Sequence, residues 1–296
     1  MTGNTGNTGN TGNTGNTGNT GNTGSVGGDG WFISDRVDLP FVTRLDPAGE
    51  NELGSLRRTP PAHFGSRQWS ANWYAWRVLH EMVAKVPGWA TTIDGDATLT
   101  TIRNDLVANY NLYINNLVLA ARDERPDAMA GILSQDVEFF TDFLAVLTAR
   151  PGSHPQTWRV LHIASLIGSF AALYFKDKYD LPRPSQICPA LLPPIPVPGH
   201  SSWPSGHSTQ AHFMKNCVLR VLAASTMPAA DQAVLRSDLS ILADTIARNR
   251  EIAGVHYPKD SEGGARIADL LNTVILTPGT VPMFDGAIAA AAGEWQ

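Results

Sequence analysis

Residues 158–179, WRVLHIASLIGSFAALYFKDKY, decide the fold of this chain. Their spacing predicts a helix that is apolar on nearly every side, with charged residues only toward its two ends. A helix of this kind belongs in the middle of a helical bundle, where other helices cover all of its faces. Its most apolar part, residues 160–175, contains His162 and is too short for a comfortable membrane span, so no membrane-spanning segment is expected.

Helical spacing also dominates on both sides of this stretch. Apolar residues recur every three or four positions over 102–121, 129–147, 230–250 and 260–275, and no alternating strand pattern of useful length occurs. The predicted fold class is therefore all-α. Residues 31–296 are predicted to form a single-domain helical bundle.

The first 30 residues differ from the rest of the chain. They are a Thr-Gly-Asn repeat followed by a Gly-rich run. Such a segment has almost no apolar side chains to bury, so burial cannot offset the entropy lost on ordering. Residues 1–30 are therefore predicted to be a disordered tail. Residues 31–70, which contain four prolines, are predicted to be an irregular arm lying over the domain.

Composition excludes several classes of protein. The 296 residues carry a formal net charge of -5, which argues against general nucleic-acid binding. The two cysteines, Cys188 and Cys217, form neither a metal-type cluster nor a disulfide framework. No basic region followed by an apolar run opens the chain, so no secretory signal is predicted and a cytoplasmic protein is expected. A homo-oligomer is compatible with the sequence, which leaves the oligomeric state open.

Candidate chemistry begins at the end of the central helix. Lys176 lies near that end, and Arg183 follows the break at Pro182. A proline-flanked turn therefore brings two cations to one helix end. Taken alone, this basic helix end also has a purely structural explanation, because cations stabilise the negative end of the helix dipole.

The second candidate segment is Pro-Ser-Gly-His at residues 204–207, where a Pro-rich loop enters a predicted helix. The exposed N–H groups of a helix N-terminus bind anions, and Gly206 lets a ligand approach the backbone closely. Ser205 adds a hydroxyl donor, and His207 exchanges protons near neutral pH. The alternative is an ordinary N-capping serine followed by a surface histidine.

The third candidate segment contains Arg250, His256 and Asp260, with a predicted turn at Gly254. A carboxylate near a histidine can hold the orientation and tautomer of its ring. The alternative is a helix C-terminal arginine, a histidine in a turn and an N-capping aspartate.

Together the three segments supply three cations, a helix N-terminus and two histidines, all at helix ends that a bundle can gather at one rim. This inventory suits charge stabilisation, nucleophilic attack and proton transfer at a tetrahedral centre. The sequence therefore predicts a cationic pocket for a tetrahedral oxyanion, either phosphate or vanadate. Its predicted residues are Lys176, Arg183, Ser205, Gly206, His207, Arg250 and His256.

The spacing Lys-x6-Arg-Pro, then Pro-Ser-Gly-His, then Arg-x5-His-x3-Asp, over residues 176–260, resembles the signature shared by three enzyme groups. These are the vanadium-dependent haloperoxidases, the type 2 phosphatidic-acid phosphatases and the bacterial class A acid phosphatases. Their fold, a helical bundle with the site among helix ends, agrees with the predicted class. Asn249 is a departure, because many relatives have serine before the arginine.

The resemblance implies a role for each matching position. His256 would be the phosphate nucleophile of a phosphatase or the axial vanadium ligand of a peroxidase. His207 would be the general acid and base, and Asp260 would orient His256. The residues implied to hold the oxygens of the oxyanion are Lys176, Arg183, Ser205, Gly206 and Arg250.

The motifs are common to both chemistries, so other features decide between them. The lipid phosphatases usually span membranes and the class A acid phosphatases are usually exported, whereas neither a span nor a signal is predicted here. His200, seven residues before His207, resembles a second histidine of the bromide-oxidising members. The favoured prediction is oxidation of halide, bromide first, by hydrogen peroxide on vanadate bound to His256. The alternatives are a soluble phosphatase that hydrolyses phosphate monoesters through a phosphohistidine, without vanadate, and an inactive oxyanion-binding bundle.

Overall fold

The computed structural model of the chain describes residues 69–275 and 277–296. Over these residues the regular elements are all helices and none is a strand, which confirms the predicted all-α class. The predicted tail at 1–30 and nearly all of the predicted arm at 31–70 lie outside the described residues. The described part contains every residue of the three motifs.

The helices follow one another along the chain with short connections, apart from the Pro-rich loop between α10 and α11. In order they are α3 (Ala71–Lys85), α4 (Trp89–Asp94), α5 (Ala97–Ala108), α6 (Tyr110–Asp123), α7 (Arg125–Val137), α8 (Phe140–Val146), α9 (Pro155–Tyr179), α10 (Pro184–Ile187), the 3-10 turn η4 (Pro189–Leu191), α11 (Gly206–Ala223), α12 (Ala229–Ile252), α13 (Pro258–Ile275) and α14 (Pro282–Ala292).

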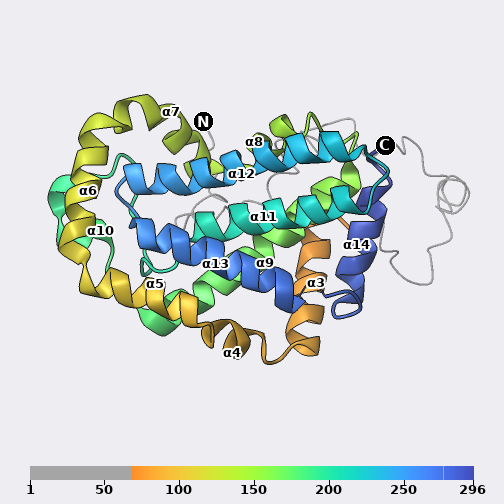
Figure 1. Cartoon of the computed structure of the whole chain (residues 1–296), viewed down its shortest axis with the longest axis horizontal. Coiled ribbons are helices and arrows are strands. Elements are labelled where there is room, and N and C mark those ends of the chain that lie inside the picture. The colour runs from red at the N-terminus through yellow and green to blue at the C-terminus, as the bar shows by residue number, and fades with distance from the viewer. Residues whose placement is uncertain (1–68, 276) are drawn as a thin grey trace, which may run out of the picture.

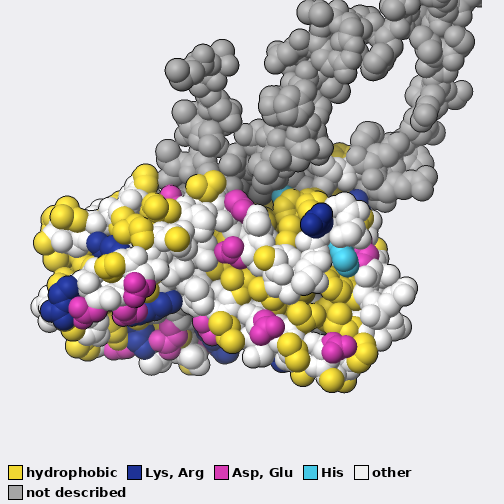
Figure 2. Space-filling view, turned by 90° about the horizontal axis from the view of Figure 1, so that it is seen from above, with side chains coloured by type: hydrophobic (Ala, Val, Ile, Leu, Met, Phe, Trp, Pro, Cys, Tyr) yellow, Lys and Arg dark blue, Asp and Glu magenta, His cyan; other side chains and the backbone are white. Residues whose placement is uncertain are grey.

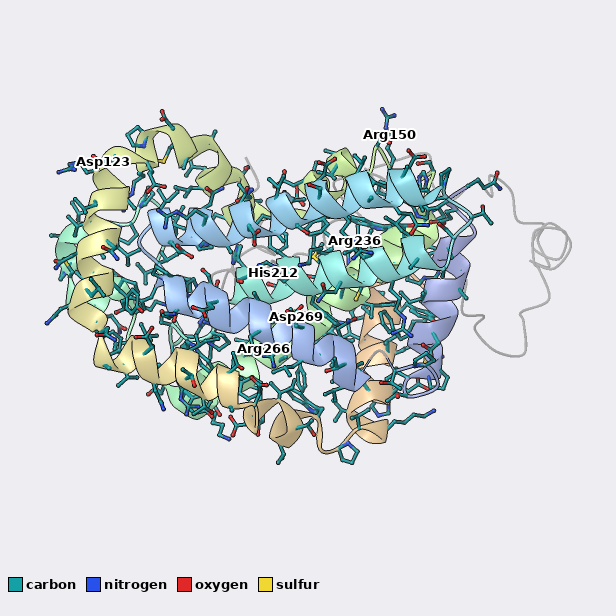
Figure 3. All side chains as sticks on the ribbon, in the orientation of Figure 1. Asp123, Arg150, His212, Arg236, Arg266 and Asp269 are labelled. Carbon is teal, nitrogen blue, oxygen red and sulfur yellow. The ribbon has the colours of Figure 1, made fainter. Side chains whose placement is uncertain are left out.

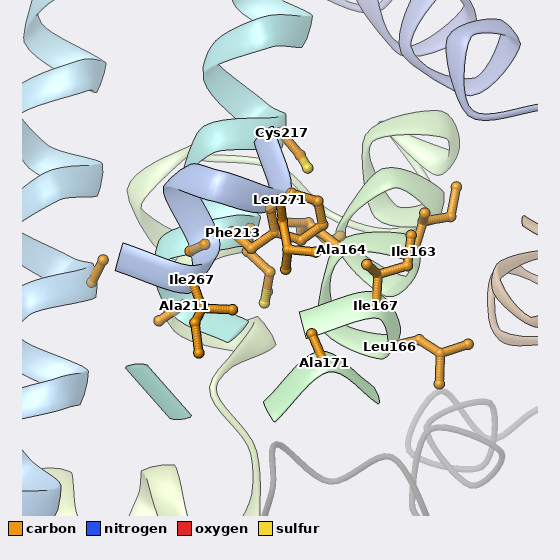
Figure 4. Close-up of a cluster of buried hydrophobic side chains, with 14 of the residues drawn as sticks. Ile163, Ala164, Leu166, Ile167, Ala171, Ala211, Phe213, Cys217, Ile267 and Leu271 are labelled. Carbon is orange, nitrogen blue, oxygen red and sulfur yellow. The ribbon is translucent and has the colours of Figure 1, made fainter. Parts of the chain in front are cut away.

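The predicted core helix is α9, and it lies in the middle of the bundle. It begins at Pro155. Proline is well suited to the first turn, because the N–H that it lacks would have no acceptor within the helix. Its residues Ile163 and Ile167 are fully buried. Figure 4 shows Ala164, on another face of this helix, beside Phe213 of α11 and Leu271 of α13. Because α9 packs against α3, α11, α13 and α14, most of its apolar surface is covered, while Leu173 and Tyr174 near its end stay exposed.

The helices α12, α11 and α13 lie side by side in front of α9, while α5, α6 and α7 curve around one end of the bundle (Figure 1). A close approach of α13 to α11 brings two of the motifs together. A Cβ on Gly264 would lie 2.7 Å from the Ser205 carbonyl oxygen, so only glycine fits there. The Ser205 N–H donates to the Asp260 carbonyl at 2.9 Å, which fixes the start of α11 against the start of α13.

Two of the predicted helical stripes are each broken in the structure. The stripe over 102–121 splits into α5 and α6 at Asn109, whose side-chain amide donates to the Asp105 carbonyl at 3.1 Å. The stripe over 129–147 splits into α7 and α8 at Glu138, whose carboxylate accepts from the Thr141 N–H at 3.1 Å. Side chains that bond to nearby backbone compete with helix continuation. The apolar spacing continues across each break, so periodicity alone predicts one helix where the structure has two.

One stretch of the described residues, Pro155–Ile187, is long and apolar enough to cross a membrane by length and composition. In the bundle 72% of its apolar window is buried, which is the behaviour of a core helix.

Figure 2 shows apolar, acidic and basic side chains intermixed on the face seen from above. Asp123 and Arg150 project outward from the periphery (Figure 3). The expected cytoplasmic location stays a prediction.

His162 is a polar residue in this core. Its ring packs against those of Phe140 and Trp158, with centroid distances of 4.8 and 4.4 Å. Neither ring nitrogen has a hydrogen-bond partner among the described residues, so the side chain packs as an aromatic core residue. Burial lowers the pKa of His162 to about 3, and the ring therefore stays neutral in the folded protein.

We expect His162→Phe to reduce the acid sensitivity of the fold. The unfolded histidine protonates below its ordinary pKa of 6.5, while the folded one, with a pKa of about 3, does not. Stability is therefore lost as the pH falls through 6.5, by about 2 kcal/mol between pH 7 and pH 5. Urea unfolding at these two pH values should show that the wild type loses about this much more than the variant. Equal losses of stability in the wild type and the variant would contradict the lowered pKa of His162.

Candidate oxyanion site

Arg183 lies at the centre of the candidate site, with only 1% of its surface exposed. Its guanidinium donates to the carbonyl oxygens of His200 and Val255, at 2.8 Å each. The same group lies 3.4 Å from Nε2 of His256. Carbonyl oxygens orient the guanidinium but carry no full negative charge, so its positive charge remains available to an anion.

Lys176 is buried under the same loop, near the end of α9. Its Nζ donates to the carbonyl oxygens of Ser201 and Ser202 at 2.8 and 2.7 Å. Burial holds the pKa of Lys176 well below its usual value, the charge of Arg183 lowers it further, and Asp260 opposes both. The ammonium therefore gains from any anion placed near it.

Arg250, in the last turn of α12, has donors that no described residue satisfies. Its Nη2 donates to Oδ1 of Asp136 at 3.1 Å. Its Nε and Nη1 are buried and have no hydrogen-bond partner in the described part of the chain. A buried donor without an acceptor costs about 1–3 kcal/mol, and more when it is charged. These two N–H groups are the clearest sign that a ligand atom completes the site.

Asp260 fixes the ring of His256. Its Oδ2 lies 2.9 Å from Nδ1 of His256 and also accepts from the Tyr257 N–H at 3.0 Å and from the Ser202 hydroxyl. Burial raises the pKa of Asp260 to about 6, so the carboxylate is ionised above that pH. A carboxylate only accepts, hence Nδ1 of His256 carries the hydrogen and Nε2 presents its lone pair beside Arg183.

The start of α11 supplies further donors. Ser205 is its N-cap, with Oγ accepting from the Ser208 N–H at 3.3 Å. The N–H groups of Gly206 and His207 make no hydrogen bond with the described residues, as is usual in a first helical turn. Such groups bind anions readily. The capping and anion-binding roles predicted as alternatives for Ser205 are therefore compatible.

The two motif histidines share one buried space with the three cations. Burial, followed by the charge of Arg250, holds the pKa of His207 well below its ordinary value, and Lys176 and Arg183 lower it further. Burial and then the same three cations act on His256 in the same direction. Direct contacts show the grouping, because His256 lies 3.4 Å from Arg183 and 2.9 Å from Asp260, whose carbonyl accepts from the Ser205 N–H. Both rings are neutral at pH 7 in the ligand-free protein.

His200 lies on the outer side of this space. Its Nδ1 is 3.0 Å from Nη2 of Arg183. Together with Arg183, Val197 and Gln186 it lines a surface cavity of about 520 Å³. The predicted second histidine is therefore in contact with Arg183 and lies between that arginine and solvent.

Gln135 and Asp136, at the end of α7, are site residues that the motifs did not predict. Asp136 pairs with Arg250, and the Gln135 carbonyl lies 3.1 Å from Nε2 of His207. They precede the first motif by 40 positions or more, and a Gln-Asp pair at the end of an apolar stripe has the pattern of an ordinary solvated helix end. Only the three-dimensional structure brings them to the site.

No protein-family model matches the chain, and no curated protein matches it. The resemblance of the three motifs to the haloperoxidase and phosphatase signature therefore stays a prediction.

We expect Arg250→Lys to weaken oxyanion binding roughly ten-fold or more. Lysine keeps the positive charge but loses the two unsatisfied guanidinium donors, and a charged hydrogen bond is worth about 1.5–3 kcal/mol. Calorimetric titration with vanadate and with phosphate measures the loss. The control is Arg248→Lys on the same helix, whose arginine pairs with Glu124 and Glu251 near the surface. Equal affinities for all three proteins would rule out this role for Arg250.

Proposed function

We propose that the chain is an oxyanion-site enzyme that oxidises halide with hydrogen peroxide on vanadate held by His256. Two observations carry the proposal. Two buried donors of Arg250 have no acceptor among the described residues, and Nε2 of His256 carries no hydrogen. Three buried cations favour an anion with several oxygens, and a neutral imidazole nitrogen is a good ligand for a transition metal. The residues present therefore fit vanadate.

Each residue has a distinct role in this proposal. Nε2 of His256 would bind the vanadium, and the hydrogen bond from its Nδ1 to Asp260 would keep that nitrogen basic and the ring fixed. Lys176, Arg183 and Arg250 would bind the oxygens and withdraw negative charge from them. Vanadate, when bound, supplies a Lewis-acidic centre that activates peroxide toward halide. His207 would take up and return the proton that peroxide binding releases.

The contact between His200 and Arg183 favours halide oxidation over phosphate-ester hydrolysis. The histidine ring lies 3.0 Å from a guanidinium nitrogen of Arg183, which would also contact the oxyanion, so a change of this side chain acts on a group that would hold the oxyanion. Its place on a surface cavity puts it on a route for a small anion such as bromide. Simple hydrolysis gives this second histidine no evident task.

The second candidate is a phosphatase, supported by the lone pair that Nε2 of His256 presents beside Arg183. Here Nε2 of His256 forms a bond to phosphorus as the bond to the leaving oxygen breaks, and protonated His207 gives its proton to that oxygen. Water then cleaves the phosphohistidine, with neutral His207 accepting a proton from it. An inactive oxyanion-binding bundle is less well supported, because His207, His256 and Asp260, which proton transfer and nucleophilic attack require, are all present.

Activity of the purified full chain distinguishes the two enzymes. We expect the protein reconstituted with vanadate to oxidise bromide in the presence of hydrogen peroxide, and the vanadate-free protein to hydrolyse a generic phosphate ester slowly or not at all. His200→Ala should change the halide preference or the pH profile and leave vanadate affinity nearly unchanged, because the backbone carbonyl of residue 200 still holds Arg183.

A matched control is His154→Ala, at the opposite end of α9, whose ring stacks on Trp295. It should leave both activities as they are in the wild type. Brisk ester hydrolysis without any bromide oxidation would overturn the peroxidase and support the phosphatase. Bromide oxidation that does not respond to His200→Ala would keep the function and remove the role of His200.

A further inference from the structure

A buried chain of hydrogen bonds runs from α8 through α7 to α12. Nε2 of Gln135 donates to Oδ2 of Asp142 at 3.0 Å, and Nδ2 of Asn249 donates to Oε1 of Gln135 at 2.8 Å. The backbone carbonyl of the same Gln135 lies 3.1 Å from Nε2 of His207. The side-chain amide of Gln135 is thus held at both its nitrogen and its oxygen, while the backbone carbonyl of Gln135 contacts the ring of His207.

The carbonyl of Gln135 is available because α7 ends at Val137. The last four carbonyls of a helix have no intrahelical donor, and the cap at Glu138 satisfies only that of Ser134. The free carbonyls also form the negative end of the helix dipole, which favours an N–H group at that position. Gln135 therefore offers His207 a directed acceptor that belongs to the backbone.

The packing around this chain is close on both sides. A Cβ on Gly131 would lie 2.8 Å from Nδ2 of Asn249, so the amide reaches Gln135 only across a glycine. The ring of Phe139 lies 5.3 Å from that of His207 and covers it. Asn249, the position at which the third motif departs from many relatives, thus has a partner of its own in this fold.

The carbonyl fixes the tautomer of His207. A carbonyl oxygen only accepts, so Nε2 of His207 carries the hydrogen and Nδ1 carries the lone pair. Nδ1 makes no hydrogen bond with the described residues. His256 has the opposite tautomer, because its Nδ1–H donates to Asp260. The two histidines therefore each keep one nitrogen without hydrogen, and the cations supply the donors.

We propose that Gln135 is a positioning residue that holds His207 as its Nε2–H tautomer, so that Nδ1 is the atom that exchanges protons in the site. The anchors of Gln135 on Asp142 and Asn249 keep its carbonyl in place. The catalytic consequence rests on the proposed function, whereas the tautomer and its dependence on Gln135 do not.

Nitrogen-15 NMR of the ligand-free protein at pH 8 tests the tautomers directly. The long-range proton–nitrogen correlations of the ring should show His207 predominantly as Nε2–H and His256 predominantly as Nδ1–H. In Gln135→Met the side chain keeps its length but loses both anchors, so His207 should become a mixture of tautomers. Asp142→Asn keeps an oxygen acceptor for Gln135 and should retain the wild-type pattern, while Asp142→Leu should lose it.

Turnover is the second measurement. Gln135→Met should lower kcat by about 10- to 100-fold with little change in KM or in vanadate affinity, because a misplaced proton-transfer group affects the chemical step. Thr157→Val is the control for a general loss of stability. It removes buried hydrogen bonds to Glu294 and Trp295 at the far end of α9 and should change neither tautomers nor kcat.

The outcomes separate this proposal from the proposed function. An Nδ1–H tautomer of His207 in the wild type would overturn it even if no variant folds. A folded Gln135→Met protein with the wild-type tautomer would also overturn it, by showing that the anchors are unnecessary. The predicted tautomers in a protein without peroxidase or phosphatase activity would support the positioning role and contradict the proposed function.

Discussion

The structure depends on the burial of three positive charges around one space. Lys176, Arg183 and Arg250 are each at most 2% exposed, and the carboxylates that the described residues bring to them are Asp136 and Asp260. An uncompensated buried charge costs several kcal/mol, so such an arrangement persists only where backbone acceptors orient the cations or a ligand neutralises them. Here carbonyl oxygens hold Lys176 and Arg183, and Arg250 keeps two donors unsatisfied. The ligand-free site is therefore prepared for an anion.

The helical bundle brings these groups together at the ends of its helices. The apolar helix α9 ends at the site, α11 begins there and α12 ends there, so a dipole end or a cationic terminal residue comes from each. Close packing at Gly264 fixes α11 against α13 and thereby places Asp260 beneath both the loop and His256. The C-terminal end of α7 closes the remaining side through Gln135 and Asp136. Stability of the bundle and geometry of the site are thus consequences of the same contacts.

Sequence predicted those parts of the molecule that local pattern determines. The all-round apolar run of α9, the N-cap at Ser205 and the end of α12 near Arg250 follow from periodicity and capping, and the structure has them. Pattern did not predict the breaks at Asn109 and Glu138, because a side chain that bonds to nearby backbone leaves the apolar spacing intact. It also did not predict Gln135, whose backbone carbonyl acts on His207, since any residue supplies a carbonyl and only tertiary packing selects one. The same holds for the loop carbonyls that orient Arg183 and Lys176.

The central claim is that one oxyanion binds among Arg183, Arg250 and His256. A crystal structure of the protein soaked with tungstate, a tetrahedral oxyanion whose metal is located by anomalous scattering, tests it most directly. The account predicts a single strong tungsten peak next to Nε2 of His256, with its oxygens in contact with Nε and Nη1 of Arg250 and with the free N–H groups at the start of α11. A peak elsewhere on the surface, or none in this space, would contradict it.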